Sequence, residues 1–357
     1  MDKTKIHFVP RNPKATASSR LRVYAVQEKL SEMGLDCQVY PAPALYTKKN
    51  FSLKRIKEFA GNIKLLYRIG QKKEILFGQK IHSQADLAYP IIFLKNLFGF
   101  KFVFDFDDAI FDYPSSRIPK LLSKADVILT GGHDLLDKAL RFNNNVKYVA
   151  TSYNPAVYDK SNYKIKKNPD IIHIGWIGRG TTHKDNLRLL VNPLKILAKK
   201  YPLKFTCIGV IGVQEINDMF GNIPNLETTF IDNIDWADES CAAEHIFGFD
   251  IGVMPLLDSI RSRGTCGGKA IQYMFCQVPA IAGPYGENRF LIQDGVNGFL
   301  ADNENQWLEK LELLISDKNL RDKLAGKGYQ TVLEKYNLNN TAKEIYEILT
   351  STENFQK

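Results

Sequence analysis

A loop of small residues between two cations stands in the second half of the chain, in the segment IGWIGRGTTHK (174–184). An apolar run typical of a strand ends at Gly178, and Arg179 and Lys184 bracket a loop that leads into a helical stretch. Exposed backbone N–H groups, the positive end of a helix and fixed cations together suit phosphate. A tight turn with a surface arginine would also explain the Gly-Arg pair alone.

A second loop of the same kind follows further along the chain. Gly267 and Gly268 stand directly before Lys269, and a short helical run over 270–276 comes next. Glycine permits close approach of the backbone to a ligand, so this loop again suits an anion. Gln272 lies one turn beyond Lys269, where its amide could bond to the hydroxyls of a ribose. Two such loops in one half of the chain favour phosphate binding more than either does alone.

Three carboxylates, Asp105, Asp107 and Asp108, follow an apolar run in the first half, in the segment FVFDFDDAIF. Carboxylates this close repel one another unless they are paired, hydrated or metal-bound. We expect no metal, because the cluster is remote in sequence from both small-residue loops and the six histidines show no paired ligand spacing. An aspartate here could accept a proton from a hydroxyl or stabilise developing positive charge. An N-cap followed by a solvated turn is the alternative.

Strand-like and helical segments alternate along nearly the whole chain and must position these residues. The strand-like runs are KIHFVP, CQVY, ADLAYP, KFVFDFDD and ADVILTGG in the first half, and IIHIGWIG, LKFTCIGVIG, TTFID, FDIGVMPL and VPAIAG in the second. Such alternation builds a parallel sheet with helices on both faces. We therefore predict an α/β protein with two Rossmann-like, doubly wound domains that face a central cleft, with ligands at the carboxyl ends of the strands.

The domain boundaries are predicted where this regularity fades. Residues 151–170 carry two prolines, many polar residues and a basic cluster, which is typical of a linker. We predict an N-terminal domain over 1–160, a linker over 161–171 and a C-terminal domain over 172–337. A final helix over 338–357 is expected to pack back on the N-terminal domain.

Composition narrows the class of protein. The 357 residues are 44% hydrophobic and 24% charged, as in soluble globular proteins. No apolar run approaches the roughly 18 residues of a membrane span, and the start of the chain has no apolar signal segment, so we expect a cytoplasmic protein. Five cysteines without a CxxC pair argue against a disulfide framework or structural zinc. The net charge of +9 suggests an anionic partner, and nucleic acid ranks last because no signature for it is present.

One stretch, from Lys48 to Lys73, departs in charge from the rest. Apolar residues fall at helical spacing within it, and Glu58 is its one acidic residue. Its basic residues are Lys48, Lys49, Lys54, Arg55, Lys57, Lys64, Arg68, Lys72 and Lys73. A basic amphipathic helix can lie on an anionic membrane surface, which would make the protein peripheral at the inner face of the membrane. A solvated face over an ordinary packed stripe is equally compatible with the pattern.

The segment from Gly264 to Ala301 resembles the family 4 glycosyltransferases, whose usual pattern there is Glu-x7-Glu followed by small residues and Gly-x-Pro. Gly178-Arg179 with Lys184 is similar to that family's Gly-Arg…Lys loop, whose cations hold a diphosphate. The similarity covers nearly all of 170–335 and, more weakly, the first half.

The chain departs from the family pattern at both glutamates. Gly264 stands at the place of the first and Gln272 at the place of the second. A branch of the family has FDxDDAIF and KxIQYM in these positions, so the changes resemble a habit of that branch. Gln277 stands where a glycine is usual, which is a milder departure.

The resemblance implies a retaining, metal-independent GT-B glycosyltransferase with a nucleotide-sugar donor (UDP or GDP) and no cofactor. The acceptor would be a glycan or a lipid-linked molecule, in polysaccharide or glycoconjugate synthesis. Implied donor-binding residues are Gly178, Arg179, Lys184, Gly267, Gly268, Lys269 and Gln272. Arg179 and Lys184 would also act in catalysis beside Asp105, Asp107 and Asp108, while Arg20, Arg22 and His133 would lie on the acceptor side. Only one of the two arginines is expected to face the site, and a lone histidine is more often structural.

Two rival functions stay open. A Rossmann epimerase or oxidoreductase would need G-x-G-x-x-G after the first strand, and FVPRNPKATASS contains none. The missing glutamates would also suit a non-catalytic nucleotide-sugar-binding or scaffold protein of a polysaccharide assembly complex.

Overall fold

The computed structural model describes residues 5–40, 53–112 and 115–355, except the side chains of Leu53, Lys54, Arg55 and Glu58. The chain divides into two compact units. Unit 1 is Met1–Ser152 with Leu338–Lys357, and unit 2 is Tyr153–Asn337. The last helix, α16 (Leu338–Thr350), therefore belongs to the unit that contains the N-terminus.

Unit 1 is built on a six-stranded parallel sheet in the order β2-β1-β3-β4-β5-β6. The four central strands, β1, β3, β4 and β5, are almost wholly buried, as strands covered on both faces must be, while the edge strands β2 and β6 are partly exposed. They are β1 (Lys5–Val9), β2 (Asp36–Val39), β3 (Ile75–Gln79), β4 (Lys101–Phe106), β5 (Val127–Thr130) and β6 (Val146–Tyr148).

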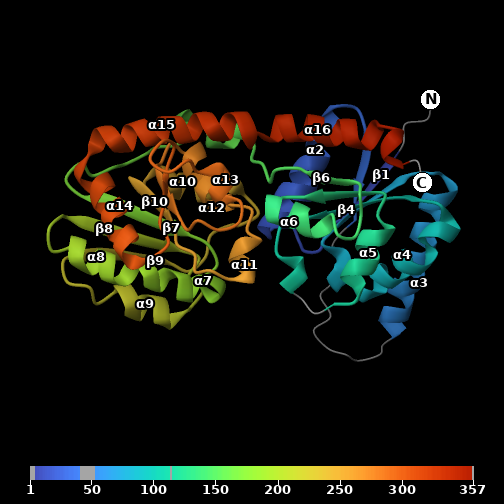
Figure 1. Ribbon diagram of the computed structural model, residues 1–357, viewed down its shortest axis with the longest axis horizontal. Coiled ribbons are helices and arrows are strands. Elements are labelled where there is room, and N and C mark those ends of the chain that lie inside the picture. The colour runs from blue at the N-terminus through green and yellow to red at the C-terminus, as the bar shows by residue number, and fades with distance from the viewer. Residues whose placement is uncertain (1–4, 41–52, 113–114, 356–357) are drawn as a thin grey trace. The chain divides into compact units, whose positions relative to one another are not determined.

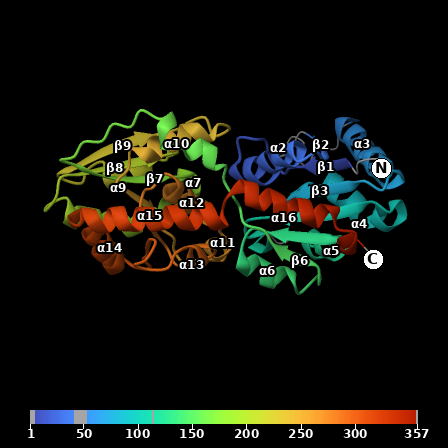
Figure 2. The same cartoon turned by 90° about the horizontal axis from the view of Figure 1, so that it is seen from above.

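Helices cover both faces of this sheet (Figure 1). On one face lie α3 (Leu53–Gln71), α4 (Ala85–Phe98), α5 (Arg117–Lys124) and α6 (His133–Ala139). On the other, α2 (Ala25–Glu32) packs beside α16 (Figure 2). The chain reaches α2 through α1 (Ala17–Ser19) and a π-helical turn, η1 (Arg20–Tyr24).

The strand expected at ADLAYP is wrong, because these residues form the start of α4. Pro90 suggested a break, since proline cannot donate the N–H that would bond to the carbonyl of Asp86. In the structure the side chain of Asn62, on α3, donates to that carbonyl at 3.0 Å instead. The missing strand is β3, which supplies the buried centre of the sheet.

Unit 2 repeats the plan, with a parallel sheet in the order β12-β11-β10-β7-β8-β9. The strands are β7 (Ile172–Ile177), β8 (Leu203–Ile208), β9 (Leu226–Ile231), β10 (Ile251–Met254), β11 (Ala280–Ala282) and β12 (Phe299–Leu300). Two glycines make room for aromatic rings on the sheet. A Cβ at Gly175 would lie 2.1 Å from the ring of Phe249, and one at Gly252 would lie 2.4 Å from the ring of Tyr273.

The helices of unit 2 again form two layers. Those that share its large core with the sheet are α7 (Gly180–Leu187), α8 (Val191–Leu197), α9 (Gln214–Phe220), α14 (Glu304–Ser316) and α15 (Lys318–Lys335). The others are α10 (Glu239–Phe247), α11 (Ile260–Arg263), α12 (Gly268–Phe275) and α13 (Asn288–Leu291).

Both sheets have a switch point, which is the place where the strand order reverses: the chain adds strands on one side of the first strand and then on its other side. It lies between β1 and β3 in unit 1 and between β7 and β10 in unit 2. Ligands of open α/β sheets bind beyond the carboxyl ends of the strands at such points. The α/β class with two parallel sheets is as predicted, and the switch points are where site residues should gather.

Candidate functional site

The loop after β7 is held close to the end of β8. The N–H of Gly178 donates to Ile208 O at 3.0 Å, and the N–H of Gly180 donates to Gly209 O at 2.8 Å. Gly209 has φ +86°, and a Cβ there would lie 1.9 Å from Gly178 O. Only glycine fits this approach. It leaves Arg179 exposed at the N-cap of α7, beside the switch point.

The side chain of Lys269 extends from the first turn of α12 to this loop. A Cβ built on Gly178 would lie 2.6 Å from Lys269 Cε, so the lysine stem lies directly over the glycine. Gly267, with φ +73°, caps α12 in a conformation that favours glycine. The two small-residue loops found in the sequence therefore meet in space.

His183 also lies at this meeting point. Its Nε2 is 3.1 Å from Lys269 Nζ, and its ring stands edge-on to that of Trp176, with centroids 6.0 Å apart. Burial, with the charges of Lys269 and Arg261, lowers the pKa of His183 to about 2, so the ring is neutral at physiological pH. Sequence reasoning passed over His183, although its place in the first turn of the helix after a Gly-Arg loop was a usable signal.

Lys184 has a different neighbour. Its ammonium forms an ion pair with Glu215 of α9, which also contacts Arg188 at 3.4 Å. The hydrogen bond that Lys184 donates to Glu215, and then the charge of that carboxylate, raise the pKa of Lys184. A phosphate that bound Lys184 would have to compete with this carboxylate.

Gln272, predicted to bind the donor, is buried, and so are Glu287 and Asn288 beside Gly267. Gln272 donates from Nε2 to the hydroxyl of Tyr158 at 3.2 Å. Glu287 accepts from the hydroxyl of Tyr336 at 3.2 Å. Asn288 donates to Gly283 O at 3.0 Å, and its buried Oδ1 accepts no hydrogen bond from the described residues. Each amide or carboxylate thus has one end fixed by the fold.

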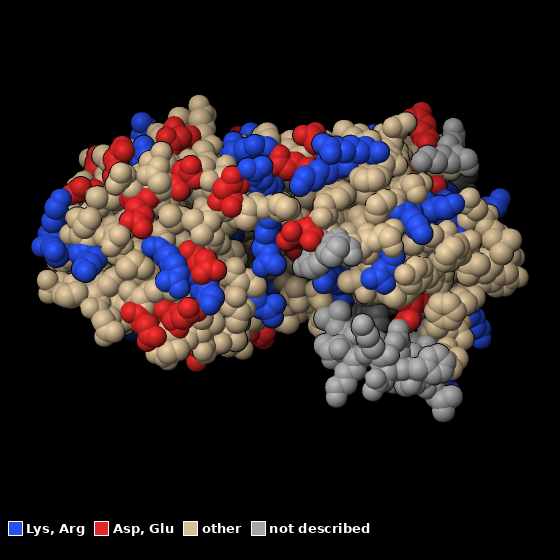
Figure 3. All heavy atoms as spheres, turned by 60° about the horizontal axis from the view of Figure 1, so that its bottom comes forward, with Lys and Arg blue, Asp and Glu red and all other residues tan. Residues whose placement is uncertain are grey.

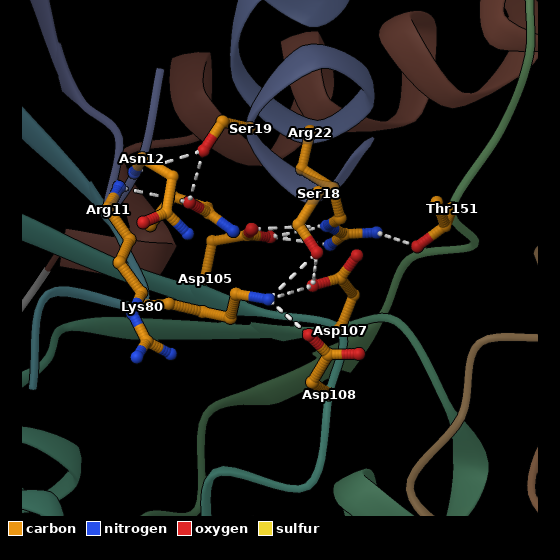
Figure 4. A network of polar contacts seen from close by, with 11 residues as sticks. Arg11, Asn12, Ser18, Ser19, Arg22, Lys80, Asp105, Asp107, Asp108 and Thr151 are labelled. Atoms are coloured by element: carbon orange, nitrogen blue, oxygen red, sulfur yellow. Dashed lines mark hydrogen bonds and ion pairs between the residues drawn. The ribbon is translucent and has the colours of Figure 1, made fainter. Parts of the chain in front are cut away.

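In unit 1, Arg22 and Asp105 form a buried ion pair (Figure 4). Arg22 Nη2 lies 2.5 Å from Asp105 Oδ1, and Nε lies 3.0 and 3.1 Å from the two carboxylate oxygens. Their side chains are 3% and 1% exposed. Arg22 Nη1 also donates to Val149 O at 2.6 Å. Burial raises the pKa of Asp105, and the guanidinium opposes that rise.

A second group beside it centres on Lys80, which follows β3 (Figure 4). Lys80 Nζ lies 2.7 Å from Ser18 Oγ and 3.2 Å from Asp107 Oδ1, and it also contacts Asp108. Burial alone would lower the pKa of Lys80, but Asp107 and Asp108 outweigh it and hold the pKa above its usual value. Lys80 has φ +51°, a strained conformation for a lysine. The Asp108 side chain is 56% exposed, while that of Asp107 is 2% exposed.

The other residues predicted for the acceptor side are Arg20 and His133. Arg20 is 7% exposed and lies in the π-helical turn. His133 begins α6 and stacks on Tyr148, with ring centroids 4.1 Å apart. Gly131, just before it, packs against Asp107, since a Cβ there would lie 2.7 Å from that of Asp107. The loops after β1, β3, β4 and β5 thus contribute to one polar region.

The described part of the chain was compared with what a metal site, a membrane span and a charged docking surface require. Its His, Cys, Asp and Glu side chains include no group of three placed to hold a metal ion. None of its helices is both long and apolar enough to span a membrane. On the face seen in Figure 3, Lys and Arg are interspersed with Asp and Glu over both units, so net charge alone marks no docking surface there.

Comparison with known proteins bears on both units. Residues 171–317 match the family model described as "Glycosyl transferases group 1". That match spans most of unit 2 but less than half of the chain. A comparison with curated proteins gives no match.

Solved structures match over the whole chain. A glycosyltransferase from Rickettsia africae is 16% identical, with a TM-score of 0.75, over 99% of this chain and 100% of that one. HepE from Anabaena, in complex with UDP and glucose, is 12% identical, with a TM-score of 0.72, over 97% and 99%. A Listeria monocytogenes protein assigned as a UDP-N-acetylglucosamine 2-epimerase is 12% identical, with a TM-score of 0.64, over 99% and 98%.

These likenesses establish the fold. Two six-stranded parallel sheets with surrounding helices match glycosyltransferase structures of the GT-B type, which confirms the predicted fold class. The epimerase likeness shows that one fold serves more than one reaction, so the activity must be argued from the site. The family match of unit 2 supports a glycosyltransferase.

Proposed function

We propose that the chain is a glycosyltransferase whose unit 2 binds a nucleoside-diphosphate sugar. The observation that carries this proposal is the meeting of Lys269 and His183 over Gly178. It occurs at the switch point of a sheet, in a segment that matches the group 1 glycosyl transferases. Cations beside the N-terminus of α7 at that point suit a diphosphate.

In this proposal, catalysis depends on stabilising the departing diphosphate. Charge placed where negative charge develops in the transition state lowers the barrier without later rearrangement. Lys269 and Arg179 supply that charge, and Lys184 joins them if it leaves Glu215. Transfer is proposed to proceed with retention and without a metal or cofactor. UDP is the first donor to test, because HepE is described in complex with UDP-glucose.

Unit 1 is proposed to take the acceptor, a glycan or lipid-linked hydroxyl compound. Among the three aspartates, Asp108 is the one with an exposed carboxylate, so we assign contact with the acceptor to Asp108. Asp105 and Asp107, both almost fully buried, would hold Arg22 and Lys80 in place. The strain at Lys80 is consistent with a functional position.

A membrane-bound acceptor is proposed from the surface of α3 and α4. Tyr89, Phe93 and Leu97 lie four residues apart on α4 and are 43%, 69% and 75% exposed. Exposed cations of the neighbouring α3 and the turn after it are Lys57, Lys64, Arg68, Lys72 and Lys73. Exposed apolar side chains beside cations suit an anionic membrane surface, here the inner face of the cytoplasmic membrane. Of the basic stretch predicted from the sequence, Lys48 and Lys49 lie outside the described residues, as do the side chains of Lys54 and Arg55.

Vesicle sedimentation tests this surface. Phosphatidylglycerol vesicles should pellet the wild type, and the double substitution Phe93→Ser with Leu97→Ser should weaken that binding. Phosphatidylcholine vesicles serve as the control. Equal binding by the wild type and the double variant would exclude α4 as the contact.

Release of the nucleoside diphosphate tests the activity itself. The purified chain is incubated with UDP-sugars and GDP-sugars, with and without extracted membrane glycolipids, and free UDP or GDP is measured. We expect release with one donor, raised by an acceptor and strongly reduced in Lys269→Met. Lys204→Met, at an exposed ion pair on β8, is the matched control. Conversion of a donor to its epimer instead of release would favour the epimerase reading.

A non-catalytic nucleotide-sugar-binding protein is the second candidate. It is favoured by Gly264 and Gln272, which stand where the family resemblance places glutamates, and by the bond that ties Gln272 to Tyr158. A chain that binds UDP-sugars yet shows neither transfer nor slow donor hydrolysis would support this reading.

A further inference from the structure

The hydrogen bonds around Asn186 determine which ring nitrogen of His183 carries the proton. Asn186 Oδ1 accepts from the N–H of Leu257 at 2.9 Å. A backbone N–H can only donate, so the amide cannot be flipped, and its Nδ2 must point to His183. Asn186 Nδ2 then donates to His183 Nδ1 at 3.0 Å.

Because Nδ1 accepts this hydrogen bond, it carries no hydrogen. A neutral imidazole has one N–H, which is therefore on Nε2. Nε2 is the nitrogen that lies 3.1 Å from Lys269 Nζ. An ammonium group has three donors and no acceptor. Two donors therefore face each other over Gly178, and neither can satisfy the other.

We infer that His183 Nε2–H and the Lys269 ammonium donate together to one phosphate oxygen of the donor. An oxygen beside the pair, within hydrogen-bond distance of both nitrogens, accepts both hydrogens and removes the conflict. This inference rests on the proposed function and deepens it, because it adds a ligand residue that was not among the expected donor-binding residues.

The neutral histidine suits this position better than another cation. It supplies a directed N–H without adding charge repulsion to Lys269, and its low pKa keeps it neutral before the diphosphate binds. Its ring is held edge-on to Trp176, so the N–H has a fixed direction. Lys184 is paired with Glu215, whereas Lys269 lies over the glycine and meets His183 there.

Calorimetric titration tests the contact. UDP, GDP and ADP are titrated into the wild type, and the tightest ligand is then titrated into His183→Leu and His183→Gln. Loss of a hydrogen bond to a charged group should weaken binding about tenfold to hundredfold in His183→Leu. The glutamine amide can donate from nearly the same place, so His183→Gln should retain most of the affinity.

The control is His173→Gln. His173 lies on β7, and both of its ring nitrogens already have partners, Gly248 O at 3.0 Å and Thr206 Oγ1 at 2.8 Å. This variant should bind the nucleotide like the wild type. Titration of the matching nucleoside, which lacks phosphates, should show no difference between the wild type and His183→Leu.

Asn186→Asp tests the tautomer separately. The carboxylate would accept from both Leu257 N–H and His183 Nδ1, which moves the proton to Nδ1 and turns Nε2 into an acceptor for Lys269. Long-range ¹H–¹⁵N correlation spectra should report Nε2–H in the wild type and Nδ1–H in the variant, and nucleotide binding should weaken in the variant.

The outcomes separate the two proposals. If no nucleoside diphosphate binds the wild type, the proposed function is overturned and this inference with it. If a folded His183→Leu variant binds as tightly as the wild type, or if the wild-type spectra show Nδ1–H, this inference alone is overturned. If a water molecule, and not a phosphate oxygen, is the shared acceptor, the His183→Leu variant should bind the nucleotide as tightly as the wild type.

Discussion

The buried ion pair of Arg22 with Asp105 is expected to stabilise unit 1, and variants of the two residues test that role. Arg22→Met removes a cation that contacts both oxygens of a carboxylate whose side chain is 1% exposed. Removal of one partner of a buried pair costs about 3–5 kcal/mol, because the other charge stays buried without compensation. At about 2–4 °C per kcal/mol for a domain of this size, the melting temperature of unit 1 should fall by roughly 6–20 °C.

The double variant Arg22→Met with Asp105→Leu completes the test. Both charges are then absent, and well-packed apolar replacements of a buried pair are often neutral. We expect the double variant to lie within about 2 kcal/mol of the wild type and well above either single variant. Asp105→Leu alone should be destabilised, since Arg22 then loses its counter-charge.

Differential scanning calorimetry of all four proteins gives these values. The exposed pair of Lys204 with Glu227 is the control, and Lys204→Met should change stability by less than about 1 kcal/mol. If Arg22→Met and Asp105→Leu each cost less than about 1 kcal/mol, or if the double variant is as unstable as the sum of the singles, the buried-pair reasoning is refuted.

Three further predictions concern single positions, and a fourth concerns the metal requirement of the reaction. Gln277 is exposed with φ +54°, so Gln277→Gly should raise the free energy of unfolding by about 1 kcal/mol in urea titrations, and a loss would contradict the strain. Gly209→Ala should abolish nucleotide binding, measured calorimetrically, because the new Cβ would collide with Gly178 O. Folding lowers the pKa of His183 from 6.5 to about 2. Below pH 6.5 the unfolded chain therefore binds a proton at this residue that the folded chain does not, and the free energy of unfolding falls by about 1.4 kcal/mol per pH unit. His183→Gln should remove that share of the slope between pH 6 and 4, and an unchanged slope would exclude a neutral buried histidine. EDTA should leave the release of UDP or GDP unchanged. Release that stops in EDTA and returns only with Mg²⁺ or Mn²⁺ would contradict a metal-independent reaction.

The fold could be predicted because its signals are local. Apolar runs separated by helical spacing indicate parallel strands and covering helices, and most of the expected strands are present. The exception, ADLAYP, failed because a side chain distant in sequence, Asn62, satisfies the carbonyl that Pro90 leaves open. At Gln277 the structure explains a departure that was noted in the sequence. The family resemblance places a glycine there, and the positive φ of Gln277 is the physical reason that glycine is favoured.

The site was harder to predict because it depends on partners. The glycines and Lys269 could be found from their spacing, and the structure brings their loops together. The ion pair of Lys184 could not, since Glu215 lies on a different helix. Nor could the burial of Asp105 against Arg22, because the two residues are far apart in sequence and meet only at the end of the sheet. The position of His183 after the Gly-Arg loop could have been noticed in the sequence, but the tautomer of its ring could not, because it depends on hydrogen bonds with Asn186 and Leu257.

Hydrogen–deuterium exchange with and without saturating UDP tests the central claim most directly. If the nucleotide lies at the switch point of unit 2, backbone amides in 178–184 and 264–270 should gain protection while the loops around Ser18 and Asp107 do not. Protection confined to other segments, with these two loops unchanged, would contradict the account.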